Sequence, residues 1–158
     1  RQVLVEPQMK NTDFPKVLGT DGKKKMGKSE NNHIELALTN EETKKVVSSM
    51  VTDPQRVRRT DPGNPDICNV FTLHKYFSAG DKVEAIDADC RSADIGCVDC
   101  KRMLSDELNE HLGPFRERRA ELARNPQYIW DILHDGADRA RTIASKTIAE
   151  VKSATGIA

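Results

Sequence analysis

The feature that most constrains the fold is a run of apolar residues at helical spacing near the C-terminal end. It follows Asn125 and Pro126, a favoured N-cap and a favoured first helical residue, and Gly156 is a typical helix stop. Its apolar positions are Ile129, Ile132, Leu133, Ala137, Ala140, Ile143, Ala144, Ile148 and Val151. This pattern predicts one long amphipathic helix whose apolar face is packed.

Other segments also favour helices. Thr39 and Glu42 have the spacing of a capping box, which would open a helix that buries Val46, Val47 and Met50 and ends by Pro54. Further helices are expected over about 65–79 and 98–124, the second kinked or broken at Gly113-Pro114, and a short strand over 3–5. The chain is therefore predicted to be mainly α-helical.

The segment "GKKKMGKS", residues 22–29, fits two phosphate-binding patterns. It formally matches the P-loop of nucleotide hydrolases, G-x-x-x-x-G-K-S, and its last five residues differ by one from K-M-S-K-S. A P-loop requires a buried strand before it and a helix opening at the Lys-Ser pair. The preceding "FPKVLGTDG" and the following "ENNHIEL" suit neither element. The residues therefore disfavour a P-loop hydrolase.

Four ordered segments resemble tryptophanyl-tRNA synthetases, which are class I aminoacyl-tRNA synthetases. They are "FPKVLGTDGKKKMGKSENNHIEL", "TDP", "DPGNPDICNVFTLHKYFS" and "GCVDCKRMLSDELNEHLGPFRERRAEL". The resemblance covers nearly the whole chain, but the H-I-G-H motif of the family's N-terminal half does not occur. It implies a C-terminal remnant of a Rossmann-type catalytic domain at 1–60, followed by an α-helical anticodon-binding domain at 61–158. Such a fragment would be inactive alone.

The resemblance also implies a mechanism. In the family, tryptophan reacts with ATP, with Mg²⁺ present, and the tryptophanyl group then moves to tRNA(Trp). Lys25 and Lys28 correspond to the motif lysines that neutralise charge on the leaving pyrophosphate, and the nucleotide site would comprise Val17, Lys25, Met26, Gly27, Lys28 and Ser29. Gly27 stands where the family usually has Ser, which removes a hydroxyl contact and adds backbone freedom, so we expect a slower or looser loop.

The four cysteines form a second chemical signal. Cys97 and Cys100 are separated by two residues at an expected helix start, so both thiolates reach one metal centre. Cys68 would come from an earlier helix and Cys90 from an Asp-rich loop over 87–97. Four unrelated reduced thiols are the alternative, but the polar surroundings of Cys97 and Cys100 explain burial poorly.

The ligand type does not distinguish between the metals, because four thiolates suit zinc and a four-iron four-sulfur cluster equally. Structural zinc more often uses two C-x-x-C pairs, whereas only one is present, which favours the cluster. The C-x-x-x-x-x-x-C-x-x-C run also resembles a bacterial subgroup of tryptophanyl-tRNA synthetases that holds an iron–sulfur cluster. We therefore expect the cluster, with zinc as the alternative.

Charge is balanced overall, with 25 Lys/Arg and 25 Asp/Glu. The candidates for tRNA contact are Lys101, Arg102, Arg116, Arg118 and Arg119, although charged helix faces are usually only solvated. No apolar run approaches the ~20 residues that span a bilayer, so a cytoplasmic protein without membrane contact is expected. The resemblance implies a homodimer formed through the catalytic domain. The rival functions are a stand-alone four-cysteine module that binds nucleic acid or protein and the P-loop hydrolase.

Overall fold

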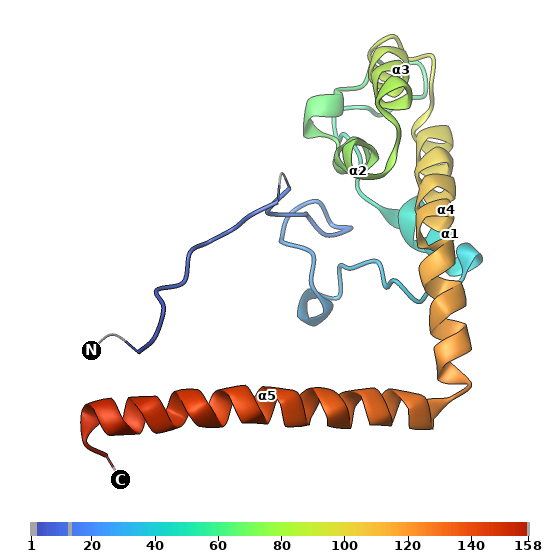
Figure 1. The fold of residues 1–158 in the computed structure, drawn as a ribbon. Helices are drawn as coiled ribbons and strands as arrows, with labels where there is room; N and C mark the ends of the chain where they lie inside the picture. The colour runs from blue at the N-terminus through green and yellow to red at the C-terminus, as the bar shows by residue number, and fades with distance from the viewer. Residues whose placement is uncertain (1–2, 13, 158) are drawn as a thin grey trace. The chain divides into compact units, whose positions relative to one another are not determined.

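The computed structural model describes residues 3–12 and 14–157 (Figure 1). Five α-helices and two 3₁₀ turns make up its regular structure, and the described residues contain no β-strand. In chain order the elements are η1 Lys28–Glu30, α1 Asn40–Ser49, η2 Pro65–Ile67, α2 Asn69–Phe77, α3 Gly80–Arg91, α4 Cys97–Ala123 and α5 Pro126–Thr155. The expectation of a mainly α-helical chain is therefore confirmed.

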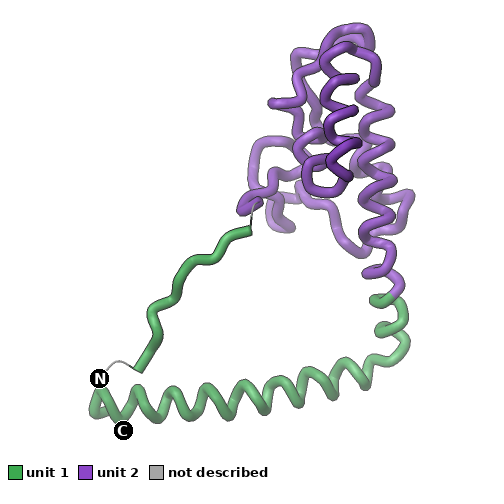
Figure 2. Tube along the Cα trace, turned by 45° about the horizontal axis from the view of Figure 1, so that its top comes forward, with its two compact units in different colours: residues 1–13, 118–158 green, residues 14–117 purple. Residues whose placement is uncertain are grey.

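The chain divides into two compact units, coloured separately in Figure 2. One unit comprises residues 14–117, from the lysine segment through most of α4. The other contains residues 118–158 together with the start of the chain. The 14–117 unit holds the buried core, every residue of the predicted nucleotide and cysteine sites, and the tRNA-contact candidates apart from Arg118 and Arg119.

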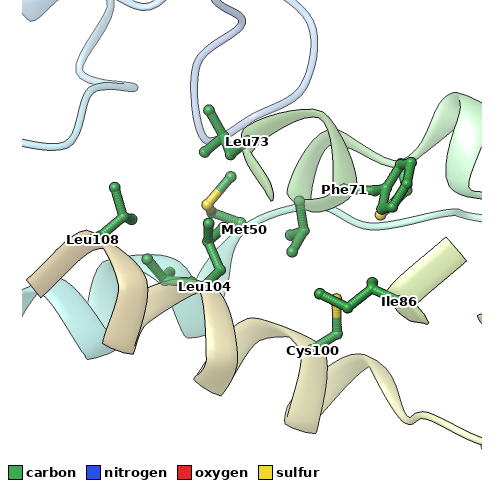
Figure 3. Close-up of a cluster of buried hydrophobic side chains, with 10 residues drawn as sticks. Met50, Phe71, Leu73, Ile86, Cys100, Leu104 and Leu108 are labelled. Atoms are coloured by element: carbon green, nitrogen blue, oxygen red, sulfur yellow. The ribbon is translucent and has the colours of Figure 1, made fainter. Parts of the chain in front are cut away.

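The core of the 14–117 unit joins four helices (Figure 3). Its buried members are Val47 and Met50 at α1, Cys68, Val70, Phe71 and Leu73 at α2, Ile86 on α3, and Cys100, Leu104 and Leu108 on α4. Val47, Val70 and Leu104 are fully buried, at 0 % exposure. Val47 and Met50 are three residues apart, and Cys100, Leu104 and Leu108 follow one another at intervals of four, which places the members of each set on one helix face.

His74 adds a polar link inside this core. It is completely buried on α2, and its Nε2 lies 3.1 Å from the carbonyl oxygen of Cys100 on α4. Because a carbonyl only accepts, Nε2 carries the proton, and Nδ1 accepts from the Ser78 hydroxyl at 2.7 Å. Burial lowers the pKa of His74, so the neutral ring is the stable form. The histidine therefore fixes α2 against the first turn of α4.

The helix termini follow the sequence signals closely. The capping box at α1 is present, because Thr39 accepts from the Glu42 amide while the Glu42 carboxylate accepts from the Thr39 amide. Asn125 caps α5 through the Tyr128 amide, and Gly156 ends it with a left-handed φ of 72°. Helix α1 ends before Pro54, as expected, with Met50 as its C-cap. These predictions are confirmed.

Several local expectations are wrong. Residues 3–5 form no strand, because three apolar residues find no neighbouring strand to share hydrogen bonds. Residues 87–91 of the segment expected as a loop around Cys90 instead belong to helix α3, whose buried residue is Ile86. Helix α4 is not broken at Gly113 and Pro114 but continues through both residues. Pro114 leaves one carbonyl without its helical N–H partner, but this part of the helix is exposed, where water can bond that carbonyl.

The apolar faces of the C-terminal helices also differ from expectation. Helix α5 forms as predicted, but it contains no buried residue. Ile132 is 50 % exposed and Ile143 70 % exposed, and Phe115 on α4 is 45 % exposed. The predicted packing of the α5 face is therefore wrong for this chain.

Candidate functional site

The lysine segment forms a tight turn between two short antiparallel stretches. Leu18 bridges to Lys25, and the Met26 amide donates to the Val17 carbonyl at 2.8 Å. Gly22 turns the chain with a left-handed φ of 64°. The turn places the Lys25 and Lys28 side chains in solvent, while Met26 is half-buried. Two cations are therefore presented on one loop to an approaching anion.

Asp21 stabilises this turn from within. Its Oδ1 accepts from the amides of Lys23 at 3.0 Å and Lys24 at 3.4 Å. These hydrogen bonds, led by the one from Lys23, lower the pKa of the Asp21 carboxyl. The turn therefore has an anion at its base even though four lysines surround it.

A P-loop does not form at this segment. After Gly27, the backbone makes only the three-residue 3₁₀ turn η1, which ends at Asn31 with a left-handed φ of 52°. No strand precedes it among the described residues. A helix N-terminus that could hold a phosphate on its amides is therefore missing from this segment.

The apolar side of the lysine loop faces the helices. Val17 and Met26 line a cavity of about 310 Å³ together with residues from α2 and α4. The other lining residues are Ile34, Leu36, Leu73, Tyr76, Phe77, Leu108, His111 and Leu112. Met26 therefore attaches the loop to the helical core, while the lysines on either side of it point to solvent.

Gly27 adopts an extended backbone, with φ −167° and ψ 148°, which any residue can adopt. A Cβ built at this position would meet nothing closer than 4.0 Å, and its two neighbours at that distance are the Lys25 carbonyl and the Ser29 hydroxyl. The loop therefore does not need glycine at position 27. The added freedom expected from the sequence is not used in this conformation.

The four cysteines lie in one region of the 14–117 unit. Cys68 precedes α2 and is buried, Cys90 lies near the end of α3, and Cys97 and Cys100 occupy the first turn of α4. Burial, reinforced by negative charge on the other three thiolates, raises the pKa of Cys100 to about 12. Burial also raises the pKa of Cys90. All four are free thiols.

Arg56 lies among these sulfurs, and no sequence pattern pointed to it. Its Nη1 is 3.8 Å from Cys90 Sγ and 4.0 Å from Cys97 Sγ. Its Nη2 donates to the carbonyls of Arg59 and Ile95, at 2.9 and 2.8 Å. Its Nε is buried without a hydrogen-bond partner. The guanidinium thus supplies a fixed positive charge beside two of the thiols.

The described residues contain no group of three or more His, Cys, Asp or Glu side chains gathered closely enough to hold a metal ion. The four cysteines are nevertheless of the ligand type that zinc and iron–sulfur centres use. Four thiolates around zinc or a four-iron four-sulfur cluster leave net negative charge, and Arg56 with its unpaired buried N–H would stabilise that charge. The same contacts suit both metals.

The basic residues predicted to contact tRNA have different surroundings. Lys101 donates to the Ser48 carbonyl at 2.8 Å, and Arg102 pairs with Asp99 at 3.2 Å. Both line a cavity of about 290 Å³ between α1 and α4, together with Lys44, Ser48, Cys97, Val98 and Ser105. Arg118 pairs with Glu121 at 2.6 Å, and Arg119 is exposed.

Arg116, the remaining member of that set, is committed to the protein itself. Its guanidinium donates to the Leu36 carbonyl, to Asn40 and Asn109 side chains and to the Thr43 hydroxyl, at 2.8 to 3.1 Å. It therefore ties α4 to the start of α1 and to the segment before it. A long cation in a charged helix gives no sequence signal that separates this role from nucleic-acid contact.

Comparison with known proteins establishes the family. A family model described as "tRNA synthetases class I (W and Y)" matches residues 5–113. The chain belongs to this family. It is 43 % identical over 157 residues to the tryptophan–tRNA ligase of Aquifex aeolicus, covering 99 % of this chain and 40 % of that protein. It is 40 % identical to the tryptophan–tRNA ligase of Deinococcus radiodurans, covering 98 % and 47 %.

The fold of this class I synthetase chain is also that of a solved relative. It matches the C-terminal portion of the tryptophanyl-tRNA synthetase of Campylobacter jejuni, complexed with ADP and tryptophan, with a TM-score of 0.77 and 30 % identity. The match covers 92 % of this chain and 45 % of that one. The chain thus spans somewhat less than half the length of these relatives. None of the helices in the described residues has the length and apolar character to cross a membrane.

Proposed function

We propose that this chain is the C-terminal part of a tryptophan–tRNA ligase. The observation that supports this most strongly is that its relatives of that name match 98–99 % of the chain. The rival of a stand-alone four-cysteine module leaves the lysine loop without a role. The largely uncovered apolar face of α5 also suits a segment that packs on further parts of a longer protein.

In this proposal the lysine loop acts on the phosphates of ATP. The tryptophan carboxylate attacks the α-phosphate, pyrophosphate leaves, and the tryptophanyl group then passes to tRNA(Trp). Lys25 and Lys28 neutralise the charge that develops on the leaving pyrophosphate, and Mg²⁺ accompanies the nucleotide. Val17 and Met26 hold the loop on the helices, and Gly27 and Ser29 complete its phosphate side.

The test of this role compares two lysines of the same loop. In the longer protein, Lys28→Ala should cost roughly 2–4 kcal/mol in transition-state stabilisation, the scale of one preorganised charge contact. Lys23→Ala, which removes the same charge outside the family motif, should change little. Tryptophan-dependent pyrophosphate exchange measures both. The 158-residue chain alone should show no exchange, because the H-I-G-H motif does not occur in it. Equal exchange rates for Lys28→Ala and Lys23→Ala would refute the proposed role of Lys28.

We further propose that Cys68, Cys90, Cys97 and Cys100 hold a four-iron four-sulfur cluster, with one zinc as the alternative. The C-x-x-C pair on the first turn of α4 and the cation of Arg56 beside Cys90 and Cys97 support a negatively charged thiolate centre. Such a centre would fasten α2, α3 and α4 to one another. Its role would be structural or directed toward tRNA.

Metal analysis tests the cysteine proposal directly. Protein purified without oxygen should absorb broadly at about 400 nm and contain about four irons per chain. Cys97→Ser should abolish this absorbance, whereas Val98→Ser, at the exposed neighbouring position, should leave it unchanged. About one zinc per chain would support the alternative. Finding neither metal would refute both.

The remaining partners follow from the same proposal. We infer a cytoplasmic enzyme that binds tRNA(Trp) and forms a homodimer through its catalytic domain. Residues 1–60 would complete that domain, and residues 61–158 would form the anticodon-binding domain. Lys101 and Arg102, on the wall of the cavity between α1 and α4, are the best placed of the predicted basic residues to meet a phosphate.

A further inference from the structure

Asn32 lies directly behind the lysine loop and is almost completely buried, at 3 % exposure. Its Oδ1 accepts from the Gly27 amide at 2.9 Å. Its Nδ2 lies 3.4 Å from the Lys25 carbonyl and 3.3 Å from Asp21 Oδ2. One carboxamide thus contacts the main chain of both Lys25 and Gly27, on the two sides of Met26.

The surroundings of Asn32 are built to admit this carboxamide. A Cβ at Gly19 would lie 2.1 Å from Asn32 Nδ2, so only glycine fits at position 19 while the carboxamide keeps its place. The Thr20 amide donates to the Asn32 carbonyl at 2.7 Å. The Gly19 carbonyl in turn accepts from Asn69 Nδ2, on α2, at 2.7 Å. A continuous set of contacts therefore runs from α2 to the lysine loop.

We propose that Asn32 is a positioning residue that sets the backbone of the lysine loop before nucleotide binds. The proposal rests on the phosphate-binding role proposed above for Lys25 and Lys28. A loop held in advance does not have to be ordered when ATP arrives, so more of the attraction between lysine and phosphate is available to the reaction. The flexible lysine side chains remain free to follow the phosphates.

Only a carboxamide satisfies all three contacts. The Gly27 amide needs an acceptor, whereas the Lys25 carbonyl and the Asp21 carboxylate both need a donor. Asn32→Asp keeps the acceptor but puts a second carboxylate against Asp21. Exchanging the two, as Asp21→Asn with Asn32→Asp, returns a donor facing an acceptor at the contact between positions 21 and 32, but the Lys25 carbonyl still loses its donor. The amides of Lys23 and Lys24 keep an oxygen acceptor in the carboxamide that this exchange places at position 21.

Amide hydrogen exchange at Gly27, followed by NMR on this chain, is the first measurement. We expect Asn32→Asp and Asn32→Ala to speed exchange at this amide by at least about tenfold, the effect of losing roughly one hydrogen bond's net stabilisation. Gly19→Ala should do the same by displacing the carboxamide. The exchanged pair should recover part of the protection, because it restores the contact between positions 21 and 32 but not the donor to the Lys25 carbonyl. Asn31→Gly, at the exposed neighbour with positive φ, is the matched control and should leave Gly27 unchanged.

The second measurement is tryptophan-dependent pyrophosphate exchange by the longer protein. Asn32→Asp should lower kcat/KM for ATP by about tenfold, again the scale of one hydrogen bond, and leave the KM for tryptophan unchanged. The exchanged pair should restore part of the lost kcat/KM. Protected amides in the core around Leu104 show that each variant is folded.

The outcomes separate this inference from the proposed function. Unchanged Gly27 exchange in a folded Asn32→Asp variant would overturn the inference, and so would failure of the exchanged pair to recover. Faster Gly27 exchange with unaltered ATP kinetics would overturn the positioning role. If the unmodified longer protein shows no tryptophan-dependent exchange, the proposed function fails. Gly27 protection then still reports whether Asn32 holds the loop.

Discussion

Replacement of Arg116 by alanine tests whether this cation serves the fold rather than nucleic acid. Its guanidinium makes four hydrogen bonds within the 14–117 unit, to the Leu36 carbonyl, the Asn40 and Asn109 side chains and the Thr43 hydroxyl. Thr43 is fully buried, and its hydroxyl already donates to the Thr39 carbonyl at 3.0 Å. The hydroxyl therefore needs Arg116 as its donor.

The expected loss follows from these contacts. Each hydrogen bond contributes about 0.5–1.5 kcal/mol net, and bonds to a charged group contribute somewhat more. Three of the four acceptors lie near the surface, where water replaces the guanidinium, so their contributions do not add fully. The Thr43 hydroxyl oxygen is the acceptor that water reaches least. We therefore expect Arg116→Ala to lower the free energy of unfolding by about 2–3 kcal/mol.

Urea unfolding of this chain, followed by far-UV circular dichroism, measures that free energy. The matched control is Arg118→Ala, which removes the same side chain two residues along α4, where it pairs with exposed Glu121. Its unfolding midpoint should not change. A double-mutant cycle with Thr43→Val should give a coupling energy of about 1 kcal/mol between Arg116 and Thr43.

The reasoning about Arg116 is refuted if Arg116→Ala unfolds at the same urea concentration as the unmodified chain. A destabilisation without coupling to Thr43 would instead show that the loss comes from the other three acceptors. In either case the fold would not require Arg116 at the buried hydroxyl.

Three further changes test other parts of the structure. Thr39→Ala should lower the free energy of unfolding by about 1 kcal/mol through loss of the α1 cap. In the unmodified chain the cap should weaken in acid, because hydrogen bonds from Thr39 lower the pKa of Glu42, so the stabilisation is present above pH 4.5 and is lost as the pH falls through the folded-state pKa. Glu42→Gln should flatten this dependence in urea titrations at several pH values. Gly27→Ser should leave the urea midpoint unchanged or slightly raised, since its Cβ meets nothing closer than 4.0 Å, and a fall of about 1 kcal/mol would contradict the extended conformation. Leu104→Ala should cost about 2–5 kcal/mol in the same assay, whereas Ile143→Ala, 70 % exposed on α5, should cost little.

Helix ends were predictable because their signals are local. A capping box needs only Thr39 and Glu42 three residues apart, and Asn125 with Pro126 specifies a helix start without reference to any other segment. The strand expected at 3–5 failed for the opposite reason. A strand exists only when another strand pairs with it, and three apolar residues say nothing about a partner.

Helix α3 was missed because its apolar pattern is thin. Only Ile86 is buried on it, and its Asp-rich sequence resembles a loop when the packing of α2 and α4 is unknown. The same limit applies to the sites. Lys25, Lys28 and the cysteines could be selected by motif and spacing, but Asn32, Arg56 and Arg116 act through contacts between residues 5 to 80 positions apart. Polar residues in such roles look like ordinary surface residues in a sequence.

The N-terminal end of α2 shows how one short helix serves both candidate sites. Cys68 and Asn69 are consecutive, and both are buried. Cys68 lies in the same buried cluster as Cys100, while Asn69 donates to the Gly19 carbonyl beneath the lysine loop. Farther along α2, Leu73 lines the same cavity as Met26. Because Cys68 is the N-cap of α2 and Asn69 is its first residue, the position of Cys68 and the floor of the lysine loop are set together.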